Sequence, residues 1–214
     1  RSKALRAVDM YQKKPEEERK PCMFVLDSLG NLSTNKEIED TLAEKTTKDM
    51  TKAQLIKGAF RMLTLKLGQA NIPMIVTNHT YESMSLYGGK QMSGGSGLMY
   101  ASSTIVYLSK SKEKDGTEVI GNIIKATTKK SRLSKENKQV EIRLFYDERG
   151  LDKYYGLLEL AEKYGVFEKV GTRYKVPDGT TQFGKTIMAN PEKYFTPDVM
   201  KQLDEAATKE YTYG

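Results

Sequence analysis

An apolar run that ends in an acidic residue is the first feature of this sequence that could support chemistry. Residues 22–26 are CMFVL, and Asp27 and Ser28 follow them directly. The run predicts a buried strand, and a carboxylate at the end of such a strand can hold the water shell of the magnesium ion that accompanies a nucleotide. Asp27 is therefore a candidate for holding magnesium through water. The pattern is weak by itself, because many buried strands of α/β proteins end in aspartate without binding a ligand.

A second polar pair, Asn78-His79, follows the short apolar stretch at 72–76. A polar side chain at a strand end can bond to phosphate oxygens while the loop attached to it moves between an ordered and a disordered state. These two residues are therefore candidates for contacting a nucleotide. A lone histidine is more commonly an ordinary surface residue, so the interpretation depends on the neighbouring motifs.

The loop that follows has the composition of a surface for single-stranded DNA. Residues 80–97 hold five glycines and no apolar periodicity, which predicts a long loop. Bases stack on flat or polarizable side chains, phosphates attract cations, and glycine lets a backbone approach closely. The alternative is a Gly/Ser-rich connector without a ligand. The candidate DNA-binding residues are Tyr81, Met84, Tyr87, Gly88, Gly89, Lys90, Met92, Gly94 and Gly95.

Two cations lie beyond a predicted strand at 118–128. Lys130 and Arg132 are two residues apart, so they project to the same side of an extended chain. Two positive charges on one side suit a phosphate that carries more than one negative charge. The alternative is a solvated basic turn, which is common in a protein whose formal net charge is +7.

Residues 179–186 match the phosphate-loop pattern GxxxxGKT at every position. A phosphate loop needs a buried strand before it and a helix after it. The preceding segment, TRYKVP at 172–177, alternates in charge and ends in proline, and Pro191 ends any helix that follows. We therefore interpret this match as a surface turn, with Lys185 as a candidate DNA contact.

The spacing of apolar residues predicts an α/β fold. Helices are expected over 5–11 and 51–71, strands at 22–27, 72–76, 104–109, 118–128 and 139–146, and a mobile polar loop over 33–50. Strands that alternate with amphipathic helices, followed by hairpins, imply a mixed sheet covered by helices. After Gly150 a short helix that ends at Gly165, a small strand near Tyr174 and a last helix opened by Thr196-Pro197 predict a separate small module.

Length and composition exclude several classes of protein. The chain has 214 residues, of which 38% are hydrophobic, so it can bury a core and is not a wholly disordered chain. No apolar run approaches the roughly 18 residues that span a membrane, and no signal-peptide core opens the chain. One cysteine and one histidine cannot form an internal disulfide or a zinc site of the usual ligand count. A cytoplasmic protein without structural metal is expected.

Four segments, in this order along the chain, resemble the RecA/Rad51 recombinase family. They are FVLDSLGNL at 24–32, IVTNH at 75–79, MSGGSGLMYASS at 92–103 and KKSRLS at 129–134. Within the family the similarity is greatest to bacteriophage recombinases, and it runs from about residue 1 to the C-terminal end. The resemblance implies a RecA-like P-loop ATPase core over 1–150, with a mixed, mainly parallel sheet whose first part is missing, and a small α+β C-terminal domain over 151–214.

The resemblance also implies an activity and its cofactors. The intact protein would be an ATP-dependent DNA recombinase that forms filaments on single-stranded DNA, pairs it with homologous duplex DNA and uses ATP and Mg²⁺. Residues 33–50 and 80–93 match the first and second DNA-binding loops, and the paired glycines 94 and 95 match a hinge. The residues implied to contact ATP or its magnesium are Asp27, Ser28, Asn78, His79, Lys130 and Arg132. Asn78 and His79 stand where the family commonly has a glutamine that senses the terminal phosphate. Lys130 and Arg132 would reach the ATP of the neighbouring subunit.

The chain begins at Arg1 without an initiator methionine, and we interpret it as a piece of a longer polypeptide. The P-loop and the catalytic glutamate would then lie upstream, and this stretch alone is not expected to hydrolyse ATP. Expected partners are single- and double-stranded DNA, further copies of the chain, and single-strand-binding and mediator proteins, in the host cytoplasm if the protein is phage-encoded. The alternatives are a non-catalytic DNA-binding accessory module and a RecA-like helicase motor, although the length and tyrosines of the second loop favour a recombinase over a helicase.

Overall fold

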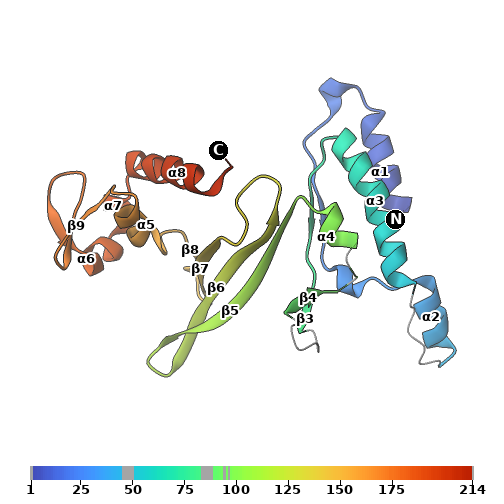
Figure 1. Cartoon of the computed structure of the whole chain (residues 1–214), viewed down its shortest axis with the longest axis horizontal. Helices are drawn as coiled ribbons and strands as arrows, with labels where there is room; N and C mark the ends of the chain where they lie inside the picture. The colour runs from blue at the N-terminus through green and yellow to red at the C-terminus, as the bar shows by residue number, and fades with distance from the viewer. Residues whose placement is uncertain (1, 45–50, 83–88, 94, 96, 214) are drawn as a thin grey trace. The chain divides into compact units, whose positions relative to one another are not determined.

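The computed structural model describes residues 2–44, 51–82, 89–93, 95 and 97–213. These residues belong to two compact units, Arg1–Ser102 and Ser103–Gly214 (Figure 1). Each unit contains helices as well as strands, which confirms the predicted mixed α/β class. Within the part of the chain that the structure describes, no helix is both long and apolar enough to cross a membrane.

The first unit is built on a pair of short parallel strands. In chain order its elements are α1 (Ser2–Gln12), η1 (Glu16–Glu18), β1 (Phe24–Leu26), η2 (Leu29–Asn31), α2 (Asn35–Leu42), α3 (Lys52–Gln69), β2 (Met74–Val76), β3 (Thr80–Glu82), β4 (Lys90–Met92) and α4 (Gly97–Ala101). Strand β1 pairs in parallel with β2, with Val25 opposite Ile75. The first two predicted helices and the first two predicted strands are confirmed as α1, α3, β1 and β2.

Alternation along β1 and β2 decides which face of this strand pair is covered. Phe24 and Met74 point toward α1 and α3, where they pack against a buried cluster of Val8, Leu67 and Ile72. A second buried cluster, Leu29, Phe60 and Leu98, lies against Leu26 and Val76. Val25 and Ile75 point to the other face and are 62% and 51% exposed. Strand β1 is therefore covered on one face by the described residues, not on both as a buried strand would be.

The polar stretch at 33–50 contains a helix, so the prediction of a loop was wrong at Asn35–Leu42, which form α2. A capping box starts this helix. Thr34 Oγ1 accepts the N–H of Glu37 at 3.1 Å, and Glu37 Oε2 accepts the N–H of Thr34 at 3.0 Å. The box satisfies two N–H groups that a helix start leaves unpaired, which stabilises a helix that buries little apolar surface.

The stretch at 80–97 also contains regular structure that the loop prediction missed. Strands β3 and β4 form an antiparallel pair in which Tyr81 lies opposite Gln91. Helix α4 begins at Gly97, where an added Cβ would lie only 2.8 Å from the Cα of Lys57 in α3. Glycine is therefore required for this close helix contact. Residues 83–88 of this stretch, and 45–50 of the preceding one, lie outside the described residues.

The second unit begins with an antiparallel sheet and ends in a small module of helices and short strands. Its elements are β5 (Thr104–Asp115), β6 (Glu118–Ser131), β7 (Gln139–Phe145), β8 (Leu151–Asp152), α5 (Leu157–Lys163), β9 (Glu168–Val170), β10 (Arg173–Lys175), β11 (Thr181–Phe183), α6 (Gly184–Ala189), α7 (Pro191–Tyr194) and α8 (Pro197–Tyr211). Strands β5 to β8 pair in that order, and each pairing is antiparallel. Among the described strands, β1 and β2 pair in parallel and the other pairs are antiparallel. A mainly parallel sheet therefore stays a prediction for the complete core.

Strands β5 and β6 confirm the predicted hairpin and extend beyond the predicted bounds. The turn between them is at Gly116, whose φ of +58° is a left-handed conformation that glycine adopts without strain. Strand β6 continues to Ser131, so Lys130 lies inside the strand and not beyond its end. The strand can continue through this polar stretch because its partner β5 supplies hydrogen bonds up to Thr104.

Residues 151–214 contain a hydrophobic core of their own. Its buried members are Leu158, Ala161, Phe167, Val176, Ile187, Tyr194, Phe195, Val199 and Leu203. The predicted helix (now α5) is followed by Gly165 at a φ of +70°, and the predicted small strand is β10. Thr196 caps α8, since its side chain accepts the N–H of Val199 and Pro197 occupies the first turn.

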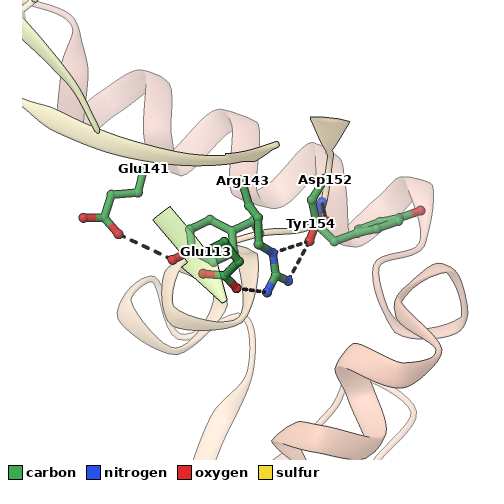
Figure 2. A network of polar contacts seen from close by, with 6 residues as sticks. Glu113, Glu141, Arg143, Asp152 and Tyr154 are labelled. Carbon is green, nitrogen blue, oxygen red and sulfur yellow. Dashed lines mark hydrogen bonds and ion pairs between the residues drawn. The ribbon is translucent and has the colours of Figure 1, made fainter. Parts of the chain in front are cut away.

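A charged network joins the sheet to the start of this module. Figure 2 shows Arg143 of β7 between Glu113 of β5 and Asp152 of β8. Arg143 Nη2 lies 2.7 Å from Asp152 Oδ2, and Nη1 lies 3.4 Å from Glu113 Oε1. The guanidinium also lies over the Tyr155 ring, 4.7 Å from its centroid. The side chain of Asp152 is 16% exposed, so loss of the arginine would leave a largely buried carboxylate with fewer donors.

We therefore expect Arg143→Ala to lower the free energy of unfolding of the second unit by about 1–3 kcal/mol, because a partly buried charge loses its partner. Arg149→Ala is the matched control. Arg149 also pairs with an aspartate, Asp147, and stacks on Phe145, but its side chain is 54% exposed. Urea denaturation followed by circular dichroism measures both. Equal midpoints for the two variants would show that the Figure 2 network does not stabilise the unit.

Candidate functional site

The carboxyl ends of β1 and β2 bring two polar residues together in the first unit. Parallel pairing places the residues that follow the strands at one edge, and the Thr77 N–H donates to Leu26 O at 3.0 Å. The Thr77 hydroxyl then donates to Asp27 Oδ1 at 2.5 Å. Asp27 is itself exposed, so its carboxylate is oriented by Thr77 while it stays accessible from solvent. This edge matches the position where open α/β sheets bind ligands.

Ser28 lies beside this carboxylate and differs from it in exposure. The residue is 7% exposed, and its Oγ is buried with no hydrogen-bond partner among the described residues. A buried hydroxyl of this kind costs free energy unless a ligand or a water completes it. An exposed carboxylate next to an unsatisfied hydroxyl fits the water shell of a hard cation such as magnesium, which prefers oxygen ligands.

His79 and Asn78 occupy different positions at the end of β2. The His79 ring lies against Gly30, since an added Cβ on Gly30 would be 3.1 Å from His79 Cδ2. Asn78 instead points toward the β3–β4 pair, and its Nδ2 donates to Ser93 O at 2.8 Å. The Ser93 N–H donates back to His79 O at 3.0 Å. Of these two residues, His79 is exposed and Asn78 is half-buried. The Asn78 side chain connects the edge to the segment that follows β4.

Three residues that the sequence interpretation did not single out thus belong to this site: Thr77, Gly30 and Ser93. Thr77 could have been found from its place directly after β2, opposite the residue that follows β1. The other two depend on the tertiary arrangement, and no local pattern marks them.

The candidate DNA-binding residues that the structure describes lie on and around the β3–β4 pair. Tyr81 of β3 is 55% exposed, and its hydroxyl lies 3.4 Å from Gln91 Oε1. Lys90 is also exposed, whereas Met92 is half-buried. The remaining candidates are Gly89, where a Cβ would meet nothing within 4 Å, and Gly95, which has a φ of +78°. Met84, Tyr87, Gly88 and Gly94 lie outside the described residues.

Lys130 and Arg132 lie at the end of β6 in the second unit. The sheet register shifts between Ile105 and Val106 of β5, so that Lys129 is an extra residue and Lys130 pairs with Ile105. Lys130 is half-buried and Arg132 is exposed. The Arg132 N–H donates to Ser103 O at 3.0 Å, which extends the β5–β6 pairing by one step. Both cations thus belong to one short segment, and the Asp27 edge belongs to the other unit.

The GxxxxGKT match at 179–186 lacks the buried parallel strand that a phosphate loop needs before it. It starts in the turn between β10 and β11, where Gly179 has a φ of +82°, and it includes β11 itself. Strand β11 pairs with β10 in an exposed antiparallel sheet, whereas a phosphate loop follows a strand of a buried parallel sheet. Helix α6 follows for six residues, and Ile187 within it fills the core of the module. This context supports the interpretation of the match as a surface feature.

Comparison with known proteins decides the family. Residues 18–152, more than half of the chain, match the family model of the RecA N-terminal domain. The chain belongs to the RecA family. This match confirms the predicted resemblance and covers both the Asp27 edge and the segment that carries Lys130 and Arg132.

Several curated members of the RecA family are similar to the chain. The recombination and repair protein of Enterobacteria phage T4 is 39% identical over 163 residues, which cover 76% of this chain and 41% of the relative. Protein RecA of Anaplasma marginale (strain St. Maries) is 28% identical over 188 residues, 86% of this chain and 51% of its own length. Protein RecA of Paracoccus denitrificans is 30% identical over 159 residues. The chain spans about half the length of these RecA-family relatives.

Proposed function

We propose that this chain is part of an ATP-dependent DNA recombinase that forms filaments on single-stranded DNA and catalyses homologous pairing and strand exchange in recombination and repair. The observation that carries the proposal is the edge where Thr77 orients the exposed Asp27 carboxylate, with the buried Ser28 hydroxyl beside it. Membership of the RecA family supports the assignment of this edge to a nucleotide. The core would extend over 1–150 and the C-terminal domain over 151–214.

Each residue of the edge has a role in this proposal. Asp27 and Ser28 would hold the water shell of Mg²⁺, which neutralises charge on the phosphates of ATP when it is bound. His79 would contact the terminal phosphate from its place against Gly30. Asn78 would pass the nucleotide state to the β3–β4 segment, since its side chain bonds to the Ser93 carbonyl.

The remaining catalytic groups would come from elsewhere. Lys130 and Arg132 would act in trans, on the ATP of the neighbouring subunit in the filament. The P-loop and the catalytic glutamate would be supplied by the part of the polypeptide that the relatives have in addition to the length matched here. The chain by itself would then not hydrolyse ATP, and the GxxxxGKT match at 179–186 would not bind a nucleotide, although Lys185 could contact DNA.

Single-stranded DNA would contact the segments at 33–50 and 80–93. We expect Tyr81→Ala to weaken binding of single-stranded DNA by about 1–3 kcal/mol, because an exposed ring on β3 can stack on a base. Lys90→Ala, on the neighbouring strand, should instead reduce the salt dependence of binding, since it removes a cation. Fluorescence anisotropy with an oligonucleotide across a salt series measures both. An unchanged affinity for Tyr81→Ala at every salt concentration would exclude stacking by this tyrosine.

The proposal includes further partners and a place of action. Duplex DNA, single-strand-binding proteins and mediator proteins would act with the filament in the cytoplasm, that of the host cell if a phage encodes the protein. The direct test is strand exchange between circular single-stranded DNA and a homologous linear duplex, run with the full-length polypeptide and ATP. Joint molecules support a recombinase. Duplex unwinding without joint molecules would indicate a helicase motor, and DNA binding without ATP hydrolysis would indicate an accessory module.

A further inference from the structure

The connection between β6 and β7, residues 132–138, has an internal scaffold of hydrogen bonds. Ser131 is 7% exposed, and its Oγ accepts the N–H groups of Leu133 and Ser134 at 3.1 and 2.9 Å. The Ser131 N–H donates to Glu136 Oε1 at 3.1 Å. One buried serine therefore fixes the backbone on both sides of the exposed residue 132.

The C-terminal end of α8 docks on this connection. The Lys135 N–H donates to Tyr211 O at 2.7 Å, and Ser134 forms an isolated antiparallel bridge with Thr212. These are backbone contacts between segments more than 70 residues apart in sequence. The C-terminal end of α8 is therefore held against the connection by backbone pairing of the kind that joins neighbouring strands.

Glu210 in that last turn links the connection to α5. Its Oε1 lies 3.3 Å from Lys138 Nζ, and its carboxylate also accepts from Lys163 Nζ at 2.6 Å and from the Tyr164 hydroxyl at 2.7 Å. The hydrogen bonds from Lys163 and then Tyr164 lower the pKa of Glu210 to about 2. The carboxylate is therefore ionised at neutral pH, and its negative charge strengthens the hydrogen bond from Lys138.

We propose that the last turn of α8 positions Arg132, with Glu210 and Tyr211 as positioning residues for this arginine. Arg132 is fixed on one side by its N–H bond to Ser103 O, and the rest of the connection is fixed by the α8 contacts. A cation that acts on a phosphate of another subunit must be held in place before the subunits meet, because disorder there would cost free energy at each turnover. The inference rests on the proposed role of Arg132 in trans.

Hydrogen–deuterium exchange of this chain tests the positioning without any catalytic assay. Glu210→Gln should raise exchange at the amides of residues 132–135 by about tenfold, because a charge-assisted tie is lost. Lys138→Met breaks the same tie from the side of the connection and should have the same effect. Unchanged exchange in both variants would overturn the proposal.

Glu162→Gln is the matched control for these variants. Glu162 of α5 also accepts from a lysine and a tyrosine, Lys169 at 3.0 Å and Tyr174 at 3.2 Å, but these partners lie in β9 and β10 and not in the connection. It should leave exchange at residues 132–135 unchanged. An equal rise in the control would mean that any loss of charge in the module loosens the connection, and the proposal would be wrong.

Turnover by the full-length polypeptide tests the consequence. Glu210→Gln should lower the kcat of DNA-stimulated ATP hydrolysis about tenfold with the KM for ATP unchanged. In Arg132→Ala, where no cation is left to be positioned, adding Glu210→Gln should cause no further tenfold loss, because both changes act through one group. A full additional loss would overturn the proposal. If Arg132→Ala retains full turnover, the role in trans fails, and the exchange result then decides separately whether α8 fixes the connection.

Discussion

Arg132→Ala is expected to lower the DNA-stimulated kcat of ATP hydrolysis by about 10³–10⁵-fold, the effect of removing an arginine that stabilises a transferred phosphate. The basis is the place of Arg132, an exposed cation on a backbone segment that is fixed beyond β6. The folding of the second unit should be unchanged, because the side chain is not part of its core. Steady-state turnover of the full-length polypeptide on saturating single-stranded DNA measures the effect.

Lys129→Ala is the matched control for this substitution. Lys129 lies in the same segment, at the register shift of β6, and its Nζ lies 5.9 Å from the centroid of the Tyr107 ring. It carries the same charge as Arg132 but has no role in the proposed composite site. A loss of turnover in Lys129→Ala as large as that in Arg132→Ala would indicate a general effect of charge, such as weaker DNA binding.

Phe167→Ala should destabilise the C-terminal module by about 3–5 kcal/mol, the usual cost of truncating a buried aromatic residue. Phe167 is 1% exposed and lies 5.4 Å from Phe195, measured between ring centroids. Chemical denaturation monitored by circular dichroism gives the loss. The control is Phe183→Ala, since Phe183 is 47% exposed and should cost much less.

The substitution Phe167→Ala also tests where the C-terminal domain begins. If residues 151–214 fold around their own core, hydrogen exchange in Phe167→Ala should rise across α5 to α8 and stay low in β5 and β6. If protection is lost equally in β5 and β6, the unit from Ser103 onward unfolds as a whole, and a domain boundary near residue 150 is wrong.

Most of the predicted elements that were confirmed have a strong apolar pattern. Helices α1, α3, α5 and α8 each repeat apolar residues at helical spacing, β1 and β2 are short apolar runs, and β7 alternates apolar with polar residues. Helix α2 was missed because its start depends on the Thr34–Glu37 capping box rather than on apolar residues. The β3–β4 pair was missed because each strand is only three residues long and the pair lies in a glycine-rich stretch.

The candidate site was predicted in part. Asp27 and His79 could be predicted from the apolar runs that precede them, because polar residues that follow parallel strands share an edge. The Thr77–Asp27 hydrogen bond and the contact of His79 with Gly30 depend on the register of β1 with β2 and on η2, which no single segment encodes. Asn78 stays a predicted nucleotide contact, and its hydrogen bond to the Ser93 carbonyl is a contact that the sequence did not indicate.

The central claim is that Asp27 of one subunit and Arg132 of its neighbour complete one ATP site, and mixed filaments test it most directly. Asp27→Asn and Arg132→Ala, each of which we expect to be inactive alone in the full-length polypeptide, are mixed on single-stranded DNA, and co-assembly is verified by fluorescence energy transfer. We expect ATP hydrolysis to recover to a substantial fraction of the wild-type rate, because some interfaces pair an intact Asp27 with an intact Arg132. Co-assembled filaments that stay as inactive as either variant alone would contradict the composite site.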